Sequence, residues 1–282
     1  MDDLHSLNEA INKRAGRKLL PSIFVSLTIF VLVFGLLAVK PILFVVLVLA
    51  ALIMGLRELN GAYRAGGIVI PDWPLAVGAV VMTAAAWFGG VSGLAVATAF
   101  VIPNILVLLL ILNPADFVKR STAATFAMFY IPFLAGFIAL IAKSDDPVGR
   151  ILVLVVLVSC NDTFAYIFGV LFGKHYLAPH ISPKKTWEGL IGSLIACTVG
   201  GALVFAFWTS QHWYLGALLG LMGVATSTFG DLIESAMKRD LHIKDMGAIL
   251  PGHGGILDRI DSVLFTAPTV WFVLELIKHF KL

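Results

Sequence analysis

Residues 148–172 read VGRILVLVVLVSCNDTFAYIFGVLF, and this stretch decides the class of fold. A helix that crosses a bilayer needs about 20 predominantly apolar residues, and the run supplies them with one carboxylate, Asp162, inside it. The whole chain of 282 residues has the same character, since 59% are hydrophobic and 13% are charged, with a mean hydropathy of +0.96. Soluble domains are nearer to half apolar and a quarter charged. The composition therefore excludes a soluble enzyme, a disordered chain and a nucleic-acid-binding protein.

Apolar runs of this kind recur along the chain, so we expect an all-α, polytopic integral membrane protein with about nine transmembrane helices. The runs are residues 19–39, 41–56, 74–88, 93–112, 122–142, 148–172, 187–209, 214–233 and 262–277. The second and third are short, which predicts tilted or partly re-entrant segments. Both cysteines, Cys160 and Cys197, lie inside apolar runs, which excludes a disulfide scaffold. We expect one membrane domain, with residues 1–150 as an N-terminal scaffold and residues 151–282 as the catalytic region.

The positions of Lys and Arg predict the orientation, because cytoplasmic loops of membrane proteins are enriched in these residues. With a cytoplasmic N-terminus, fifteen of the 20 Lys and Arg residues lie inside and five outside. The opposite orientation reverses this bias. We therefore expect a multi-pass protein of the cell (plasma or inner) membrane with its N-terminus in the cytoplasm. Residues 174–188 and 234–261, the two charge-rich stretches of the second half, then both face the cytoplasm.

Carboxylates are concentrated in the second half of the chain. Asp162 lies inside a span, where an ionisable group is costly and marks a functional site by default; the alternative is a buried polar group that holds helices together. Asp231 and Glu234 are three residues apart, which places them on one helix face. For this pair the alternative is an ordinary helix end with an ion pair between Glu234 and Lys238.

The densest polar stretch, residues 235–262, reads SAMKRDLHIKDMGAILPGHGGILDRIDS. Its basic residues can neutralise phosphate charge, and the glycines of residues 251–255 let backbone N–H groups approach an anion. Asp258 and Asp261 offer the hard oxygen ligands that suit Mg²⁺. A positive-inside loop with helix-capping aspartates is the alternative. That alternative accounts for the basic residues, and less well for aspartates, a histidine and glycines beside them.

Residues 174–188 form a second basic, hydroxyl-rich patch, which is either an ordinary positive-inside loop that attracts anionic headgroups or a second wall of one anion site. The residues together predict a cytoplasm-facing site at membrane depth. Its candidate metal ligands are Asp162, Asp231, Asp258 and Asp261. Such a site suits transfer at phosphorus between a soluble nucleotide and a lipid, in which catalysis is mostly positioning and charge neutralisation. Residue chemistry alone does not name the lipid, the nucleotide or the leaving group.

Residues 235–261 resemble the signature of the phosphatidate cytidylyltransferases, also called CDP-diacylglycerol synthases. The shared elements are a Ser followed by Lys-Arg, then Lys-Asp, His-Gly-Gly and Asp-Arg-x-Asp at the family's spacing. Upstream, Asp162, Tyr166, Gly173, residues 182–189 (SPKKTWEG) and residues 230–235 (GDLIES) are also similar to the family. The resemblance covers residues 159–262. In the first 150 residues it extends only to the apolar spans.

The resemblance implies attack of the lipid phosphate of phosphatidate on the α-phosphorus of CTP, which gives CDP-diacylglycerol and pyrophosphate. No general base is expected, because the attacking oxygen is already anionic. The implied catalytic residues are Asp231, Asp258, Asp261, Lys238 and Arg239, and the implied metal ligands are Asp162, Asp231, Asp258 and Asp261. The implied substrate-binding residues are Ser182, Lys184, Lys185, Thr186, Ser235, Lys244, His253, Gly254, Gly255 and Arg259.

The resemblance also implies Mg²⁺ as cofactor, leaves a second, monovalent cation open, and implies a homodimer with CTP, phosphatidate and membrane lipid as partners. Two alternatives remain. The first is a CTP-dependent transferase or kinase that acts on another polyprenyl or ether lipid, which product identity would separate. The second is a cation-coupled transporter with Asp162 as its coupling site. A transporter needs access from both faces, whereas these polar groups lie on one face and no inverted halves are apparent.

Overall fold

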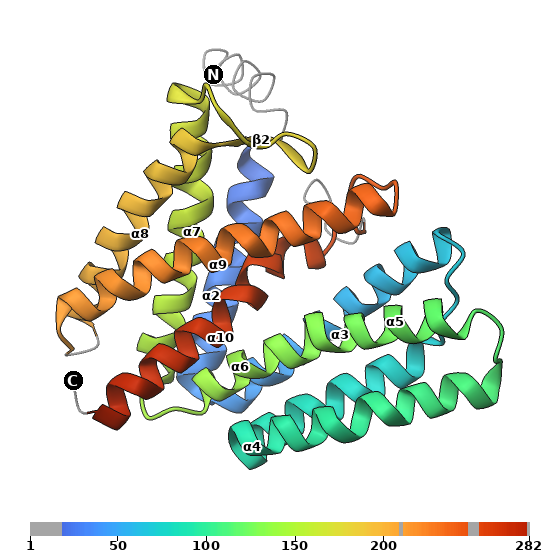
Figure 1. The fold of residues 1–282 in the computed structure, drawn as a ribbon. Helices are drawn as coiled ribbons and strands as arrows, with labels where there is room; N and C mark the ends of the chain where they lie inside the picture. The colour runs from blue at the N-terminus through green and yellow to red at the C-terminus, as the bar shows by residue number, and fades with distance from the viewer. Residues whose placement is uncertain (1–18, 209–210, 248–253, 281–282) are drawn as a thin grey trace.

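The structure is a computed structural model that describes residues 19–208, 211–247 and 254–280. In these residues, helices joined by short loops make up the structure apart from one short two-stranded hairpin (Figure 1). The elements are α2 (Leu19–Val39), α3 (Pro41–Ala65), α4 (Asp72–Leu112), α5 (Phe117–Met128), η1 (Phe129–Phe133), α6 (Leu134–Ala142), α7 (Pro147–Phe172), β1 (Tyr176–Ala178), β2 (Ser182–Thr186), α8 (Trp187–Phe207), α9 (Trp213–Asp240) and α10 (Leu257–Phe280).

Seven helical segments of the described chain are long and apolar enough to cross a membrane, with α5, η1 and α6 forming one of them. Many large apolar side chains on the outer faces are exposed, among them Phe100 of α4 and Val170 of α7. A surface of this kind suits lipid rather than water. The predicted all-α integral membrane protein is confirmed at this level, whereas the count of nine spans and the cytoplasmic N-terminus stay predictions.

Helix α4 is a helical hairpin. Gly90, with φ 68° and ψ −158°, breaks the helical conformation inside it, and only glycine takes up such a φ without strain. The two arms then run back along each other (Figure 1), so that a Cβ on Gly93 would meet the backbone of Ala85 and a Cβ on Gly78 would meet Val101. The arms correspond to the two predicted segments 74–88 and 93–112. The short second and third runs are thus parts of the longer helices α3 and α4.

Helix α10 begins near the middle of the molecule and runs to its edge, and it packs against α3, α6, α7 and α9 (Figure 1). Its inward side chains Leu264, Ala267 and Val270 are fully buried. The helix therefore joins the part of the chain before residue 150 to the part after it. The predicted division into a scaffold of residues 1–150 and a catalytic region of residues 151–282 stays a prediction.

Helices α8 and α9 cross at very close range because both carry glycine at the crossing. A Cβ on Gly216 would meet the carbonyl oxygen of Gly201, and a Cβ on Gly201 would meet the carbonyl oxygen of Gly216. Small residues at such a crossing let helix backbones touch in a membrane, where van der Waals packing drives association. This contact fixes the angle at which α9 carries its polar C-terminal end toward the hairpin.

Replacing Gly216 with Val is expected to lower the free energy of unfolding by about 1–3 kcal/mol, the usual cost of forcing extra carbons into a packed interface. Denaturation in mixed detergent micelles measures this loss. Gly61→Ala in α3 is the matched control, because Gly61 is exposed and a Cβ there meets nothing within 4 Å. That control is expected to match the native protein or exceed it slightly. Equal unfolding curves for Gly216→Val and the native chain would contradict the close crossing.

Candidate active site

A partly open cavity of about 240 Å³ lies where the hairpin meets α7, α8 and α9. Its polar lining comes from three elements: α7 supplies Asn161, Asp162 and Tyr166; the hairpin supplies Ser182, Lys184, Lys185 and Thr186; and α9 supplies Thr228 and Asp231. Ala165, Leu177 and Leu190 complete the wall. The cavity thus brings together carboxylates and lysines that the sequence separates by up to about seventy residues.

The hairpin is held across the ends of α7 and α8 by local contacts. Its strands are antiparallel, with Tyr176 opposite Thr186 and Ala178 opposite Ser182. Thr186 is the N-cap of α8, and its hydroxyl accepts a hydrogen bond from the Gly189 amide at 3.1 Å. A Thr side chain in this position satisfies an otherwise unpaired amide of the first helical turn. That bond fixes the backbone at Thr186, next to Lys185, whose side chain lines the cavity.

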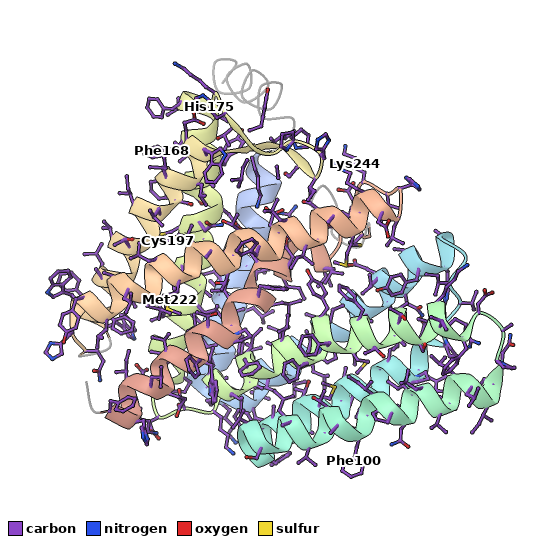
Figure 2. The ribbon with its side chains drawn as sticks, viewed as in Figure 1. Phe100, Phe168, His175, Cys197, Met222 and Lys244 are labelled. Atoms are coloured by element: carbon purple, nitrogen blue, oxygen red, sulfur yellow. The ribbon has the colours of Figure 1, made fainter. Side chains whose placement is uncertain are left out.

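His175 and Glu188 close the base of the hairpin. The Nδ1 atom of His175 lies 2.7 Å from Oε1 of Glu188, and the Trp187 amide donates to the His175 carbonyl at 3.0 Å. Figure 2 shows His175 at this end of the molecule. The hairpin contains the only β-strands of the described residues, in a stretch that the sequence predicts as a loop.

Asp231 is the carboxylate with direct basic and hydroxyl partners in the cavity. Lys185 Nζ lies 2.8 Å from Asp231 Oδ2, and the Ser235 hydroxyl donates to Asp231 Oδ1 at 3.2 Å. The side chain of Lys185 is 20% exposed and that of Asp231 is 36% exposed, so a ligand in the cavity can reach both. This ion pair joins the hairpin to α9. It places an ammonium group and a carboxylate beside each other where a phosphate and its cation would need them.

Asp162 and Asp261 lie around Asp231. Asn161 is buried and donates to Asp162 Oδ1 at 3.3 Å and to the Ser227 hydroxyl at 3.0 Å, which ties α7 to α9. Asp261 is 7% exposed, and its charge interacts with those of Asp231 and Asp162. Like charges gathered in a partly buried place repel one another unless a cation lies among them. Two of the four predicted metal ligands, Asp162 and Asp231, thus line the cavity, and the charge of a third, Asp261, acts on both.

Asp258, the fourth predicted ligand, belongs to a second polar cluster. Its carboxylate accepts hydrogen bonds from Lys238 Nζ at 2.9 Å, from the Gly255 amide at 2.7 Å and from the Met246 amide at 3.1 Å. Lys238 also donates to Glu234 Oε2 at 2.6 Å. Lys238 is thus clamped between two carboxylates. For Glu234 the two alternatives are a site residue and an ordinary helix end that pairs with Lys238. The ion pair with Lys238 is present, and it is buried among predicted site residues, so both alternatives have support.

The residues fit Mg²⁺ through a small set of carboxylates. Within the described parts of the chain, no group of three or more His, Cys, Asp or Glu side chains is arranged to hold a metal ion. Mg²⁺, however, binds through one or two carboxylates plus substrate phosphates and water. Asp162 and Asp231 supply two carboxylates to one cavity. The donor set consists of oxygens, which is the chemistry that this ion prefers.

The remaining predicted residues lie around these two clusters. Arg239 is exposed and its Nε donates to the Ile181 carbonyl at 3.3 Å, which links α9 to the hairpin. Lys244 is exposed just beyond the end of α9 (Figure 2), and Arg259 is exposed on the first turn of α10. Gly254 has φ 80° beside Asp258, and Gly255 is buried. His253 lies outside the described residues, as does Thr209 at the end of the predicted span 187–209.

One buried acid beside the second cluster, Glu58 of α3, is absent from the sequence-based prediction. It is 7% exposed, and its carboxylate accepts hydrogen bonds from the amides of Ile256 and Leu257 at 3.0 and 2.9 Å. The only local signal is an acid at the second position after the predicted run 41–56, next to Arg57. That pattern suits a loop, because partners nearly two hundred residues away leave no trace in it.

Fold and site together define an integral membrane protein in which acids and lysines of several helices and of the hairpin converge at one end of the bundle. Comparison with known proteins narrows the class. The model of the family described as "Cytidylyltransferase family" matches residues 22–277. The chain therefore belongs to the Cytidylyltransferase family and is a nucleotidyltransferase. The match also begins well before residue 159, so the family likeness extends through the first half as well.

Individual relatives agree with this assignment. A phosphatidate cytidylyltransferase of Mycobacterium leprae (strain TN) is 37% identical over 280 residues, which cover 94% of this chain and 90% of the relative. One from Mycobacterium bovis is 35% identical over 277 residues, with 94% and 90% covered. One from Staphylococcus haemolyticus is 43% identical over 155 residues, which are 54% of this chain and 59% of the relative.

Proposed function

We propose that this enzyme transfers the cytidylyl group of CTP to phosphatidate, giving CDP-diacylglycerol and pyrophosphate. The observation that carries the proposal is the cavity in which Asp162, Asp231 and Lys185 converge at the end of membrane-crossing helices. A nucleotide needs charge-neutralising groups, and a lipid phosphate can reach them only near a membrane surface. The names of the relatives with the broadest coverage agree with this substrate pair.

The reaction needs a cluster that orients two anions against each other. A phosphate oxygen of phosphatidate forms a bond to the α-phosphorus of CTP, the bond from that phosphorus to the bridging α–β oxygen breaks, and pyrophosphate leaves with the electron pair. The attacking oxygen is already anionic, so no side chain has to remove a proton. Catalysis then rests on alignment and on neutralising charge in the transition state.

The roles of the residues follow from their positions. Lys184 and Lys185 of the hairpin would hold phosphate oxygens at the cavity, and Ser182 and Thr186 lie on the same wall. Asp162 and Asp231, with Asp261 beside them, would hold the cation. Members of the Cytidylyltransferase family generally use a divalent metal, and we propose Mg²⁺. When bound, the ion would neutralise negative charge on the phosphates.

The second cluster would neutralise the charge of the leaving pyrophosphate and hold the site residues in place. Lys238 and Arg239 are basic residues on the last turns of α9, and Arg259 is on the first turn of α10. We propose that they receive the charge of the pyrophosphate, together with Lys244. Asp258 lies among backbone amides and Lys238, so we propose that it acts as ligand or as organiser of this second cluster.

Purified enzyme with phosphatidate, Mg²⁺ and CTP labelled in its α-phosphate tests the reaction. The expected result is label in a CDP-lipid, lost when the metal is chelated. If label entered a lipid only when a polyprenyl phosphate or an ether lipid was supplied, that lipid and not phosphatidate would be the acceptor. Transfer from CTP labelled in its γ-phosphate would indicate a kinase instead. No label from either nucleotide with any acceptor would overturn the proposal and favour a transporter.

We further propose that the site faces the cytoplasm, which the distribution of Lys and Arg supports. Sealed vesicles of known sidedness test this. Added CTP is expected to be used by inside-out vesicles and not by right-side-out vesicles until a detergent opens them. Equal use by both, without detergent, would contradict the orientation. The homodimer implied by the resemblance stays a prediction.

A further inference from the structure

Glu58 is an acid of the first half of the chain that reaches the second polar cluster. It lies on α3, is 7% exposed, and accepts the amide hydrogens of Ile256 and Leu257 at 3.0 and 2.9 Å. A carboxylate that accepts two amides at a helix N-terminus gains from charge-assisted hydrogen bonds and from the helix dipole. Glu58 therefore supplies from another helix the cap that α10 would otherwise take from its own sequence.

The close approach of Glu58 depends on two glycines. A Cβ on Gly255 would meet Oε2 of Glu58, and a Cβ on Gly247 would meet Oε1. Each contact would be too short for a real side chain. Gly247 and Gly255 therefore lie against the same carboxylate, one after the end of α9 and one before the start of α10.

Asp258 holds the same segments from the other side. Its carboxylate accepts the amides of Gly255 and Met246 and the ammonium of Lys238. Two acids, Glu58 of α3 and Asp258 of α10, thus accept hydrogen bonds from backbone amides at and before the start of α10. Asp261 follows one turn later on the same helix and faces the charges of Asp231 and Asp162. A shift of the first turn of α10 would move both aspartates together.

We propose that Glu58 is a positioning residue of the transferase, which acts through the first turn of α10 by fixing Asp258 and Asp261. This inference rests on the proposed function. A residue that only stabilised the fold would change the amount of folded protein. A positioning residue also changes the turnover of the molecules that are folded. Removing groups that orient metal ligands typically lowers metal affinity or activity by about 10–100-fold.

The test compares Glu58→Gln with Asp72→Asn, in detergent-purified full-length enzyme. Asp72 is a matched control because its carboxylate accepts hydrogen bonds from Asn60 and Arg64 of the same helix, α3, and touches neither polar cluster. Both changes replace a carboxylate by an amide of the same shape. The kcat per folded enzyme is expected to fall about 10–100-fold in Glu58→Gln and to stay near the native value in Asp72→Asn.

Three further readouts separate positioning from stability. The Mg²⁺ concentration for half-maximal rate is expected to rise in Glu58→Gln alone. Glu58→Asp, which keeps the charge on a shorter side chain, is expected to recover part of the kcat. Hydrogen exchange of residues 254–260 is expected to quicken in Glu58→Gln and not in Asp72→Asn, and this can be measured on whatever fraction folds.

A native kcat in folded Glu58→Gln, or a loss of kcat no larger than that in Asp72→Asn, would overturn the positioning role. The proposed function would then still stand. Unchanged exchange at residues 254–260 would overturn it as well. A native enzyme that makes no CDP-lipid would overturn the proposed function, and the inference with it.

Discussion

Replacing Asp231 with Asn is expected to lower turnover by about 10²–10³-fold or more, as expected when a group that stabilises transition-state charge is removed. Asp231 lines the cavity together with Asp162, and it holds Lys185 at 2.8 Å. The amide keeps the shape of the side chain and removes the negative charge. A cation would then lose one of two carboxylates in the cavity, and Lys185 would lose its partner.

Folding is expected to survive this change. The ion pair between Asp231 and Lys185 is partly exposed, at 36% and 20% of the side chains. Exposed and half-exposed pairs contribute about 0–1 kcal/mol to stability. The unfolding curve of Asp231→Asn in detergent should therefore stay close to the native one while the formation of labelled CDP-lipid falls. This separation of activity from stability identifies a residue that acts on the substrates.

Asp145→Asn is the matched control for Asp231→Asn. Asp145 also pairs with a lysine, since Lys278 Nζ lies 3.0 Å from its Oδ2, but neither residue lines the cavity and the pair is well exposed. The hydrogen bond from Lys278 lowers the pKa of the Asp145 carboxyl. Asp145→Asn is expected to keep native turnover. Native rates in Asp231→Asn would refute its place in the metal site.

Replacing Lys238 with Met is expected to remove activity and also to lower the free energy of unfolding by about 3–5 kcal/mol, the usual cost of breaking a buried ion pair from one side. Lys238 lies between Glu234 Oε2 at 2.6 Å and Asp258 Oδ1 at 2.9 Å. The two acidic side chains are only 2% and 8% exposed. Without the ammonium group, two buried carboxylates face each other with no positive charge between them.

A double variant tests that explanation. Adding Glu234→Gln to Lys238→Met removes one of the two stranded charges, so part of the lost stability is expected to return. Activity should not return, because the ammonium group remains absent. Lys278→Met serves as the control, since that lysine is 56% exposed and its partner 87% exposed, and the expected loss is within about 1 kcal/mol. No recovery in the double variant would show that the charge balance is not what Lys238 maintains.

The sequence predicts the membrane class and most helices well, because a long apolar run has few other solutions. Residues 148–172 are predicted as a span, and α7 is Pro147–Phe172. The ends of α9 and α10 are less well predicted. The apolar runs stop at residue 233 and start at residue 262, whereas the helices continue to Asp240 and begin at Leu257. Charged residues of the expected loop are therefore helical, and their charges are balanced within the cluster around Lys238.

Sequence reasoning names candidate residues where the chemistry is carried by residue type, and not where it depends on backbone partners. Acids and lysines in a membrane protein stand out by themselves, so Asp162, Lys185 and Asp231 could be named before their positions were known. The split of the four aspartates into two clusters, and the use of Asp258 to hold backbone amides, has no counterpart in spacing. Glu58 was missed for the same reason.

The contact between Glu58 and Leu257 spans 199 residues, and this separation sets the order in which the protein can be assembled during synthesis. The α3 segment leaves the ribosome early, and Glu58 cannot accept its two amide hydrogen bonds until the α10 segment has been made and inserted. A carboxylate held near the membrane without a partner is costly. Until the α10 segment has been made, Glu58 therefore lacks the two amide donors that it has in the complete structure, so this cap can form only late in synthesis.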